Sequence, residues 1–323
     1  MRKFVFVVLL ALFALSIQAQ LLYRISGKDA SGASYILGTY HFAPSSFCDS
    51  IPGLWDSFAQ VKQVCGELVM SEMMNPENVM KLQKAMMLPE GKTIQTLLTD
   101  DEMKRLNAFT KEVLGMDFTG PLLSQLGSFT PGALYEQFIV MLYLRKTPNF
   151  NPNDGIDTYM QTKGLEKGYS VTGFESVDLQ IKALFQSQSL ERQKQVLMCL
   201  IDNKEMMVDN TDRLTAAYFK QNLEEIGKIV DEKRNDECDT TEEEEEVLIY
   251  GRNANWMSQM PQMLREKSTL FVVGAAHLIG EKGMLQLLRN AGYVVEPVTN
   301  LIGEKGMLQL LRNAGFVVEP VTK

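Results

Sequence analysis

Two short apolar runs that each end in Gly-x-x-His constrain the fold of this chain more than any other feature. The first is Tyr35–His41 and the second is Leu270–His277, and the chain contains no other histidine. Apolar runs of this length predict buried strands, and the glycine allows a close backbone approach at the strand end. In open α/β sheets ligands bind beyond the carboxyl ends of the strands. We therefore expect the two histidines to share one site.

The segments around these runs predict an α/β fold with a central mixed β-sheet flanked by helices. Residues 21–27 and 33–41 read as a hairpin that leads to His41. Further strands are predicted over 61–70 and 169–175, and each carries one acid, Glu67 and Glu175 respectively. If Glu67 points inward it must be paired or bound to metal, because an unpaired buried charge costs several kcal/mol; on an edge strand it would face solvent.

Residues 71–150 are rich in methionine and predict a helical insertion that forms a cap over the sheet. Thr99 and Glu102 have the spacing of a capping box, which predicts a helix to about Leu114. Methionines of this block could form an adaptable peptide-binding surface, but core filling is the simpler interpretation. The four that raise this question are Met73, Met74, Met86 and Met87.

Three further helices are predicted after the cap. Two of them lie between Leu190 and about Lys233, with a break near Asn210. A third helix is predicted to begin after Thr241, with acidic residues in its first turn, and to end near Leu264. The polar residues of this helix lie just before the second Gly-x-x-His run in the sequence.

The N-terminus predicts a secretory signal over residues 1–19, with basic residues, an apolar stretch and a small residue at the cleavage position, although an uncleaved anchor is the alternative. Removing its two basic residues from the 32 in the chain leaves 30 Lys and Arg against 40 Asp and Glu, a net charge of −10. This balance argues against nucleic acid and anionic membranes as partners. We expect an exported protein, periplasmic or secreted, with no stable membrane insertion after cleavage and a peptide or small molecule as substrate.

Four cysteines in an exported chain allow up to two disulfides in three connectivities. Cys199 with Cys238 is the favoured pair. Cys48 and Cys65 can equally be free and buried, because a chain of this size does not require disulfides for stability.

The tail contains a near-exact internal repeat. Residues 278–300 recur as 301–323, and the copies differ only at Tyr293/Phe316 and Asn300/Lys323. Each copy predicts a helix followed by a strand, with a glycine ending the helix. A solenoid needs more copies, so a recent tandem duplication or an error in the source sequence explains the repeat better. We predict one domain over residues 20–300, in which the first copy packs and the second is peripheral or adds an edge strand.

The candidate site combines the two histidines with the two acids. Imidazole nitrogen and carboxylate oxygen make a mixed ligand set that suits zinc, manganese or cobalt. In such a site the metal polarises a carbonyl and a nearby glutamate takes a proton. The helical zinc-protease motif His-Glu-x-x-His is absent from the sequence.

The motifs of this chain, in this order, resemble those of the TraB/GumN family, which is related to the Tiki metalloproteases. The resemblance covers about residues 21–298 and includes both Gly-x-x-His motifs. It rests further on Gly66-Glu67, Gly155-Ile156-Asp157, Phe174-Glu175-Ser176 with Gln180, and Arg252-Asn253 with Trp256.

The resemblance implies a metal-dependent hydrolase, and in the Tiki branch a peptidase that uses manganese or cobalt. It implies His41 and His277 as metal ligands, Glu67 as a ligand or general base, and Glu175 as a second acid at the metal. Arg252 and Asn253 would orient a substrate carbonyl or carboxylate, for which the guanidinium fork is well suited; an ordinary helix-surface pair is the alternative. Asp157, at a loop-to-helix junction, is interpreted as a helix cap.

Three functions follow as hypotheses. The first is an exported metal-dependent hydrolase, a peptidase. The second is an esterase-like hydrolase that uses a histidine base without metal. The third is a non-catalytic protein that binds a peptide or a metal-containing ligand through the methionine-rich cap.

Overall fold

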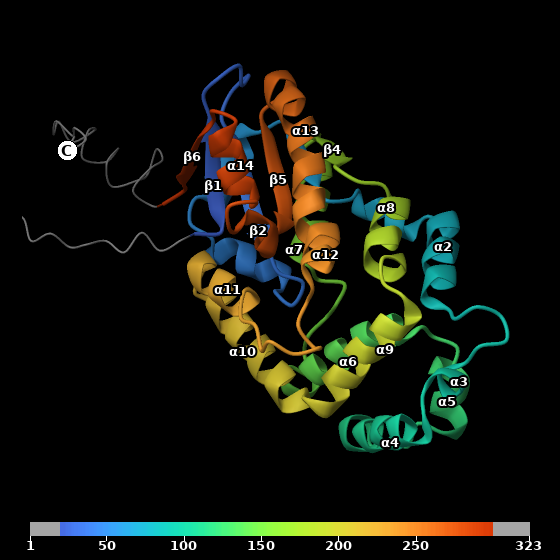
Figure 1. Ribbon diagram of the computed structural model, residues 1–323. Coiled ribbons are helices and arrows are strands. Elements are labelled where there is room, and N and C mark those ends of the chain that lie inside the picture. Colours follow the sequence, from blue (N-terminus) through green and yellow to red (C-terminus); the bar gives the residue numbers. More distant parts are fainter. Residues whose placement is uncertain (1–19, 300–323) are drawn as a thin grey trace, which may run out of the picture.

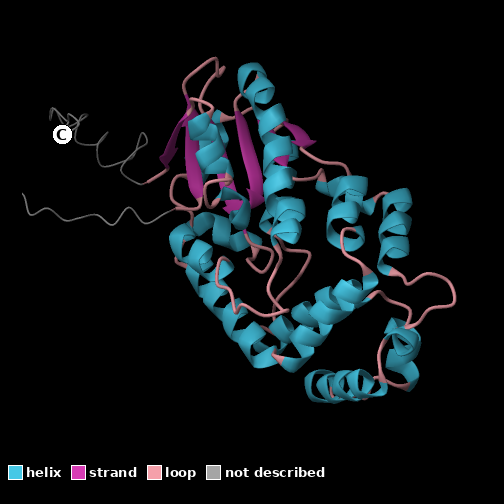
Figure 2. Cartoon of the chain, viewed as in Figure 1, coloured by secondary structure: helices cyan, strands magenta, loops and turns pink. Residues whose placement is uncertain are grey.

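The structure, a computed structural model, describes residues 20–299. The predicted signal at 1–19 and the second tail copy at 301–323 lie outside the described residues. The fold is α/β, with a six-stranded mixed sheet in the order β4-β3-β5-β2-β1-β6 (Figures 1 and 2). The strands are β1 Leu22–Ser26, β2 Ser34–Thr39, β3 Gln63–Gly66, β4 Ser170–Gly173, β5 Thr269–Gly274 and β6 Val294–Pro297.

Four neighbouring strands, β4, β3, β5 and β2, are parallel to one another. Strand β1 is antiparallel to both of its neighbours, β2 and β6. Strands β2 and β5 lie side by side in the sheet interior and consist largely of buried apolar residues. The predicted hairpin and both Gly-x-x-His strands are therefore confirmed. Parallel strands buried on both faces read as continuous apolar runs, which is why these two were visible in the sequence.

Helices cover both faces of the sheet. In Figure 1, α13 and α14 lie in front of the sheet and α7 lies behind it, while α6, α9, α10 and α11 lie below. The helices are α1 Leu54–Gln60, α2 Pro76–Met86, α3 Ile94–Leu97, α4 Asp100–Leu114, α5 Gly120–Leu126, α6 Pro131–Lys146, α7 Ile156–Glu166, α8 Val177–Ile181, α9 Leu190–Asp202, α10 Lys204–Phe219, α11 Leu223–Val230, α12 Glu242–Glu245, α13 Gly251–Glu266 and α14 Met284–Asn290. Short helical segments are η1 Ser45–Ser50, η2 Met70–Met74, η3 Lys182–Gln186, η4 Glu246–Tyr250 and η5 Ala275–Leu278.

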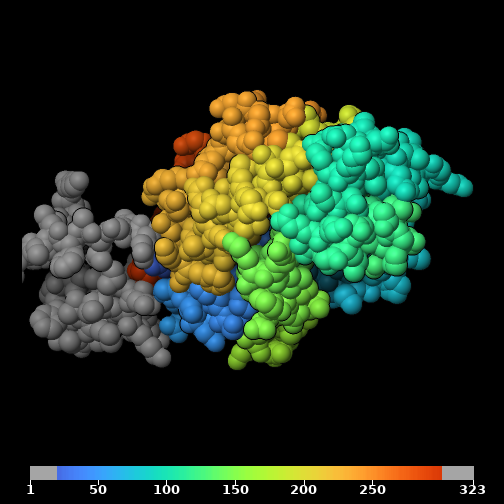
Figure 3. Space-filling view, turned by 90° about the horizontal axis from the view of Figure 1, so that it is seen from below, coloured from blue at the N-terminus to red at the C-terminus, as the bar shows by residue number. Residues whose placement is uncertain are grey.

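Two separate apolar clusters form the main cores. One lies around the sheet and includes Trp256 and Phe271. The other joins helices α3–α6 of the predicted cap to Leu197 and Ile201 of α9. The cap core therefore draws on a helix beyond residue 150. Seen from below, the yellow segments of α9 and α10 lie beside the teal segments of α4 and α5, and orange, green and blue segments also form part of this face (Figure 3).

Local helix signals in the sequence are largely confirmed. Thr99 caps α4 and Thr241 caps α12, each in a capping box with the glutamate three residues on. The predicted break near Asn210 is wrong, because Asn210 lies inside α10 and the chain breaks at Asn203 and at 220–222. Asparagine in a helix interior is only mildly unfavourable, so it does not have to end a helix.

The interpretation of the methionine stripe as core filling is wrong for two residues. Met74 is 80% exposed and Met87 is 40% exposed. Met73 packs in part against a small cluster built on Leu68 and Ile181. Short segments such as η2 present only some of their apolar side chains to a core.

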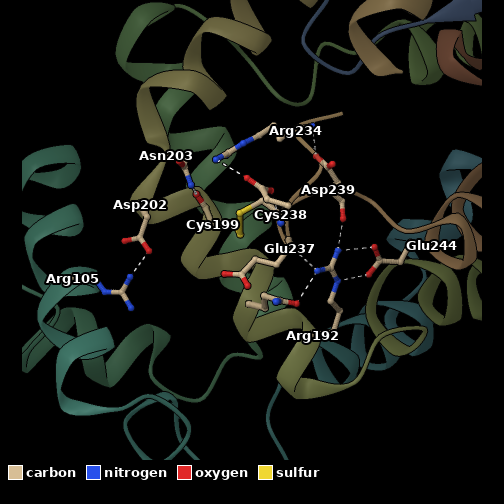
Figure 4. The surroundings of a disulfide bond; sticks show 12 residues. Arg105, Arg192, Cys199, Asp202, Asn203, Arg234, Glu237, Cys238, Asp239 and Glu244 are labelled. Carbon is tan, nitrogen blue, oxygen red and sulfur yellow. Dashed lines mark hydrogen bonds and ion pairs between the residues drawn. A yellow bond between two sulfur atoms is a disulfide. The ribbon is translucent and has the colours of Figure 1, made fainter. Parts of the chain in front are cut away.

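The favoured disulfide is confirmed. Cys199 of α9 is bonded to Cys238 (Figure 4). Cys48 and Cys65 are free and buried. Disulfides form and persist in oxidising compartments outside the cytoplasm. Among the helices of residues 20–299, none combines the length and apolarity that crossing a membrane requires.

Candidate functional site

The predicted site residues come together at the carboxyl ends of adjacent parallel strands. In register, Thr39 of β2 pairs with Gly274 of β5, and Gly66 of β3 pairs with Val272 of β5. The strands therefore end at the same edge of the sheet, and the chain continues from them to His41, His277 and Glu67. The backbone N–H of Gly274 donates to Glu67 Oε1 over 2.8 Å.

The tautomer of His277 is determined by the neighbouring Asn253 amide. Asn253 Nδ2 donates to the carbonyl oxygens of His277 (3.1 Å) and Lys282 (2.9 Å). Its Oδ1 therefore faces His277 Nδ1 at 2.8 Å, and that ring nitrogen must carry the proton. The lone pair of the ring is left on Nε2. Burial lowers the pKa of His277 to about 4, so the ring is neutral at pH 7.

Arg252 joins the histidine to both acids. Its Nε and Nη2 donate to Glu175 over 2.9 and 3.0 Å, and Nη2 also donates to Glu67 Oε2 over 2.6 Å. Its Nη1 donates to Leu248 O over 3.1 Å and lies 3.2 Å from His277 Nε2. A guanidinium has five N–H donors. All five are therefore directed at protein acceptors, and in this arrangement Arg252 holds other side chains in position.

Glu67 is ionised at neutral pH although burial favours its neutral form. The pKa of Glu67 would rise through burial, but the positive charges of His277 and Arg252 and the Gly274 N–H bring it below its ordinary value. Because His277 is neutral above about pH 4, Arg252 and the Gly274 N–H are the partners that act at neutral pH. Glu67 Oε1 lies 3.7 Å from His277 Nε2.

The side chain of Glu175 is 3% exposed, less than the side chains of Arg252 (14%) and Glu67 (19%). Besides the two donors of Arg252, it accepts the indole N–H of Trp256 over 2.7 Å. The Trp256 ring lies 4.3 Å from the His277 ring and 5.2 Å from the Phe174 ring, centroid to centroid. The predicted role of Glu175 as a metal ligand stays a prediction, and in the structure its carboxylate holds Arg252 and Trp256.

A π-helical segment places Arg252 in this network. Helix α12, the π segment η4 and helix α13 follow one another without interruption, and Arg252 is the second residue of α13. Helical insertions of this kind shift the side chains that follow and occur often at functional sites. The predicted single helix from Thr241 to about Leu264 is confirmed in extent, but its π segment left no recognisable sequence signal.

His41 differs from His277 because its side chain is exposed. Its ring takes part in no hydrogen bond or ion pair within the described part of the chain. Burial raises the pKa of Asp157 and of Glu136, and a positive charge on His41 would oppose that rise in both. Burial lowers the pKa of His277, and a positive charge on His41 would lower it further. His41 therefore lies close to the acids and to the second histidine.

Asp157 does not cap its helix. Gly155 is the N-cap of α7, and Asp157, in the first turn, instead accepts the hydroxyl proton of Thr39 over 3.0 Å. Desolvation, together with the negative charge of Glu67, raises the pKa of Asp157 above its ordinary value. Asp157 therefore belongs to the neighbourhood of His41, and the cap interpretation is corrected.

Two further residues, Gln161 and Glu136, support the site without a recognisable signal in the sequence. Gln161 of α7 donates to Leu68 O over 2.8 Å and accepts the Met70 N–H over 2.9 Å, so it fixes the chain just after Glu67. The carboxylate of Glu136, which lies on α6 of the cap, interacts electrostatically with His41. Neither residue follows a strand or a motif glycine, and the contacts of Gln161 span more than 90 residues of sequence.

The donor chemistry of two residues fits the metal that the resemblance implies. The Nε2 lone pair of neutral His277 and the ionised Glu67 are ligands that zinc, manganese and cobalt accept. The opposite ring nitrogen of His277 is held by Asn253, which is typical of ligating histidines. Within residues 20–299, however, no group of three or more His, Cys, Asp or Glu side chains is arranged to hold a metal ion. The Arg252 guanidinium contacts both donors instead.

Comparison with known proteins identifies the family of the chain. The model of the TraB/PrgY/gumN family matches residues 21–297. This chain belongs to the TraB/PrgY/gumN family. Neither a curated protein nor a solved structure matches it. The part that matches the TraB/PrgY/gumN model ends at Pro297, the last residue of β6, so the second tail copy lies beyond it.

Proposed function

We propose that this TraB/PrgY/gumN protein is an exported, metal-dependent hydrolase that cleaves peptide bonds. The main support is the pairing of a neutral His277, whose tautomer is fixed, with an ionised Glu67 whose Oε1 lies 3.7 Å from Nε2. His41 follows the neighbouring strand end and offers a second ring nitrogen. The Cys199–Cys238 disulfide supports export.

The residues divide into reacting and positioning groups in this proposal. His41 and His277 would hold the ion, which when bound supplies Lewis-acid polarisation of a carbonyl. Glu67 accepts the proton of the attacking water as general base. Arg252 and Asn253 are positioning residues, because their donors are already used on Glu67, Glu175, His277 and backbone carbonyls. Glu175 and Trp256 hold Arg252.

Metal content and turnover test this proposal together. The purified mature chain should contain divalent metal in stoichiometric amount, and His41→Ala and His277→Ala should each lose metal and cleavage of a peptide library read by mass spectrometry. Asn255→Ala, an exposed change on α13, is the matched control and should keep both. A metal-free preparation that cleaves at the same rate would overturn the metal mechanism.

One observation favours a second candidate, a hydrolase that uses a histidine base without metal. Arg252 Nη1 donates to the Nε2 lone pair of His277, which is therefore occupied. The exposed ring of His41 is available to take a proton from water. This candidate predicts that chelator-treated protein still hydrolyses simple aryl esters and that His41→Ala alone abolishes the activity. Peptide binding that survives Glu67→Gln, with no cleavage under any condition, would instead support a binding protein.

A further inference from the structure

A surface groove exposes the Cys199–Cys238 disulfide. The groove lies between α4, α9 and the chain that leads from α11 to α12, and it encloses about 830 Å³. Both cysteines line it and both are half-buried, so a solute that enters the groove reaches the sulfur atoms (Figure 4). An exposed disulfide is reduced more readily than an enclosed one. The groove is therefore a place where a thiol can attack this bond.

Cys238 tethers a segment of the chain that has no anchor in an apolar core. None of the residues 230–252, which we call the tethered segment, is buried, and none belongs to any of the three apolar clusters. The tethered segment runs from the last residue of α11 through α12 and the π segment η4 to Arg252. Burial of apolar surface is the dominant favourable term in folding. The position of the tethered segment therefore depends on polar contacts and on the disulfide.

Two strong ties join the tethered segment to α9. One is the disulfide, and the other is Arg192, which donates to both carboxylate oxygens of Glu244 over 2.8 and 2.9 Å. Two further ion pairs between the tethered segment and the rest of the chain consist of exposed side chains, Arg213–Glu232 and Lys282–Glu246. Exposed ion pairs contribute little to stability. Opening the disulfide therefore removes one of the two strong ties.

The rest of the loop that the disulfide closes is held independently. The end of α9, helix α10 and helix α11 lie between Cys199 and Cys238. Tyr218 of α10 and both Ile226 and Ile229 of α11 are buried in the core around the sheet. Opening the disulfide therefore leaves these helices in place and frees the tethered segment in particular.

The tethered segment ends at the residue that holds the acids of the site. Arg252 Nη1 donates to the carbonyl oxygen of Leu248, which belongs to η4. The same guanidinium donates to Glu67 and to Glu175. Because α12, η4 and α13 are continuous, a displacement at Glu244 is transmitted along the helix toward Arg252. A looser connection to α9 therefore loosens the hold of Arg252 on Glu67.

We propose that the Cys199–Cys238 disulfide is a redox switch that controls the position of Arg252, and that dithiol reductants open it from the groove. A thiolate of the reductant bonds to one cysteine sulfur, and the other cysteine leaves as a thiolate that takes up a proton. The second thiol of the reductant then displaces the first. The reductant becomes a disulfide, and the protein gains two electrons and two protons as two thiols. The effect on catalysis rests on the proposed hydrolase function, whereas the effect on Arg252 does not.

Alkylation of the native protein tests whether the groove admits a reductant. The chain is treated with dithiothreitol and then with iodoacetamide, without denaturant, and each cysteine is read by peptide mass spectrometry. Cys199 and Cys238 should be alkylated. Cys48 and Cys65 are internal controls that should stay unmodified, because both are buried and burial raises the pKa of each thiol to about 12. Reduction that occurs only in urea, or alkylation of all four cysteines together, would show that the bond opens through unfolding and would overturn the proposal.

Amide hydrogen exchange tests the effect on the support of Arg252. Peptides from residues 242–252 should exchange at least about tenfold faster after reduction, since losing a disulfide typically changes an opening equilibrium by more than that factor. Peptides from β5 should be unchanged, and reoxidation in air should restore slow exchange. The Cys199→Ser, Cys238→Ser double variant should exchange fast with or without dithiothreitol. Equal exchange of residues 246–252 in the oxidised and reduced chains would overturn the proposal.

Peptide cleavage by the same samples separates this proposal from the proposed function. A hydrolase should cleave more slowly after reduction and recover on reoxidation, because Glu67 loses a fixed partner. Unchanged cleavage alongside faster exchange would overturn the switch and leave the hydrolase standing. If neither state cleaves any peptide, the proposed function fails, and the exchange of residues 242–252 decides whether the disulfide controls the position of Arg252.

Discussion

At the scale of single residues, the orientation of one buried amide decides the protonation state of the candidate site. Asn253 is fully buried, and its two Nδ2 hydrogens are donated to two different backbone carbonyls. Only Oδ1 is then available to His277, which fixes the ring proton on Nδ1. A glutamine or serine at this position could not satisfy the two carbonyls and the ring in the same geometry.

Replacing Asn253 with alanine should therefore affect both stability and the tautomer. Asn253→Ala leaves buried carbonyls and the Nδ1–H without partners, and a buried group that loses its hydrogen bond costs roughly 1–3 kcal/mol. Urea unfolding measures the free energy, and nitrogen NMR of the histidine ring measures the tautomer. The exposed Asn255→Ala on the same helix is the control and should change neither. A variant with unchanged stability would contradict the hydrogen-bond assignment.

The depressed pKa of His277 predicts that the metal-free protein loses stability in mild acid. The unfolded histidine binds a proton near pH 6.5, whereas the folded one does so only near pH 4. Between these values the unfolded state binds more protons, so stability falls as pH falls through this window, by about 3 kcal/mol in all. Unfolding should be measured between pH 7 and pH 4.5 in chelator. His277→Gln removes this titration, so its stability should fall less over the same range.

At the scale of elements, the site depends on how closely α7 and the segment after β3 approach the strand ends. A Cβ on Gly66 would lie 2.3 Å from Gln161 Nε2 and 2.8 Å from the Leu68 carbonyl oxygen. The Leu68 oxygen belongs to the backbone that follows Glu67, so it cannot move without moving the acid. The φ angle of Gly66 is not in the left-handed region, so backbone conformation does not require a glycine at this position. The close approach of Gln161 and Leu68 is the reason that a side chain does not fit.

Gly66→Ala should accordingly destabilise the protein and disturb Glu67. Overpacking of this kind typically costs about 1–3 kcal/mol. Gly32→Ala is the matched control, because its nearest neighbour, Ser268 Cβ, would lie 3.8 Å away and its φ is permitted for alanine. Thermal unfolding of the two variants gives the comparison. Equal melting temperatures would show that Gln161 and the Leu68 segment adjust freely.

The sequence predicted those elements whose causes are local and missed those whose causes are not. The caps at Thr99 and Thr241 and the helix end at Gly292 each depend on a few adjacent residues, and all three are present. Both Gly-x-x-His strands were visible because they are buried on both faces. The bonds of Arg252 to Glu175 and Glu67 join residues 77 and 185 positions apart, so no local pattern could reveal that its donors are already occupied.

The same limit applies to the acids of the site. Glu67 and Glu175 were identified because the first lies within, and the second at the end of, an apolar run that predicts a strand. Glu136 reaches the same region from a helix of the cap, where a glutamate is ordinary. Asp157 has the position of a helix-start acid in the sequence, and only the fold brings it to the Thr39 hydroxyl.

At the scale of the whole molecule, one disulfide and one arginine join the cap core to the segment that carries the site. Cys199 lies on α9, and Cys238 lies in the connection between α11 and α12 (Figure 4). Beside it, Arg192 of α9 donates to both carboxylate oxygens of Glu244 over 2.8 and 2.9 Å and to the backbone oxygens of Glu237 and Asp239. Helix α13 with Arg252 continues from this segment.

Removing the disulfide should destabilise the protein without unfolding it. The Cys199→Ala, Cys238→Ala double variant should lose about 2–4 kcal/mol of unfolding free energy, the usual range for a disulfide. Arg192 and its acceptors still hold the connection, so we expect circular dichroism of the native state to be unchanged. Urea unfolding of the unchanged chain with and without reductant should give the same difference. Native protein that is equally stable in both conditions would show that the disulfide does not constrain the fold.

Truncation before Leu301 tests whether the fold is complete without the second tail copy. The first copy already packs as α14 and β6, and β6 is paired with β1. Pro297 has no N–H to donate, and Arg289 Nη2 donates to the Val295 carbonyl over 3.4 Å. Deletion of 301–323 should therefore leave the melting temperature within about 2 °C, which corresponds to less than about 1 kcal/mol for a chain of this size. Deletion from Met284 is the contrasting variant, because it removes α14 and β6 and exposes β1, and it should prevent stable folding. A large loss on removal of 301–323 alone would mean that the second copy has a docking place of its own.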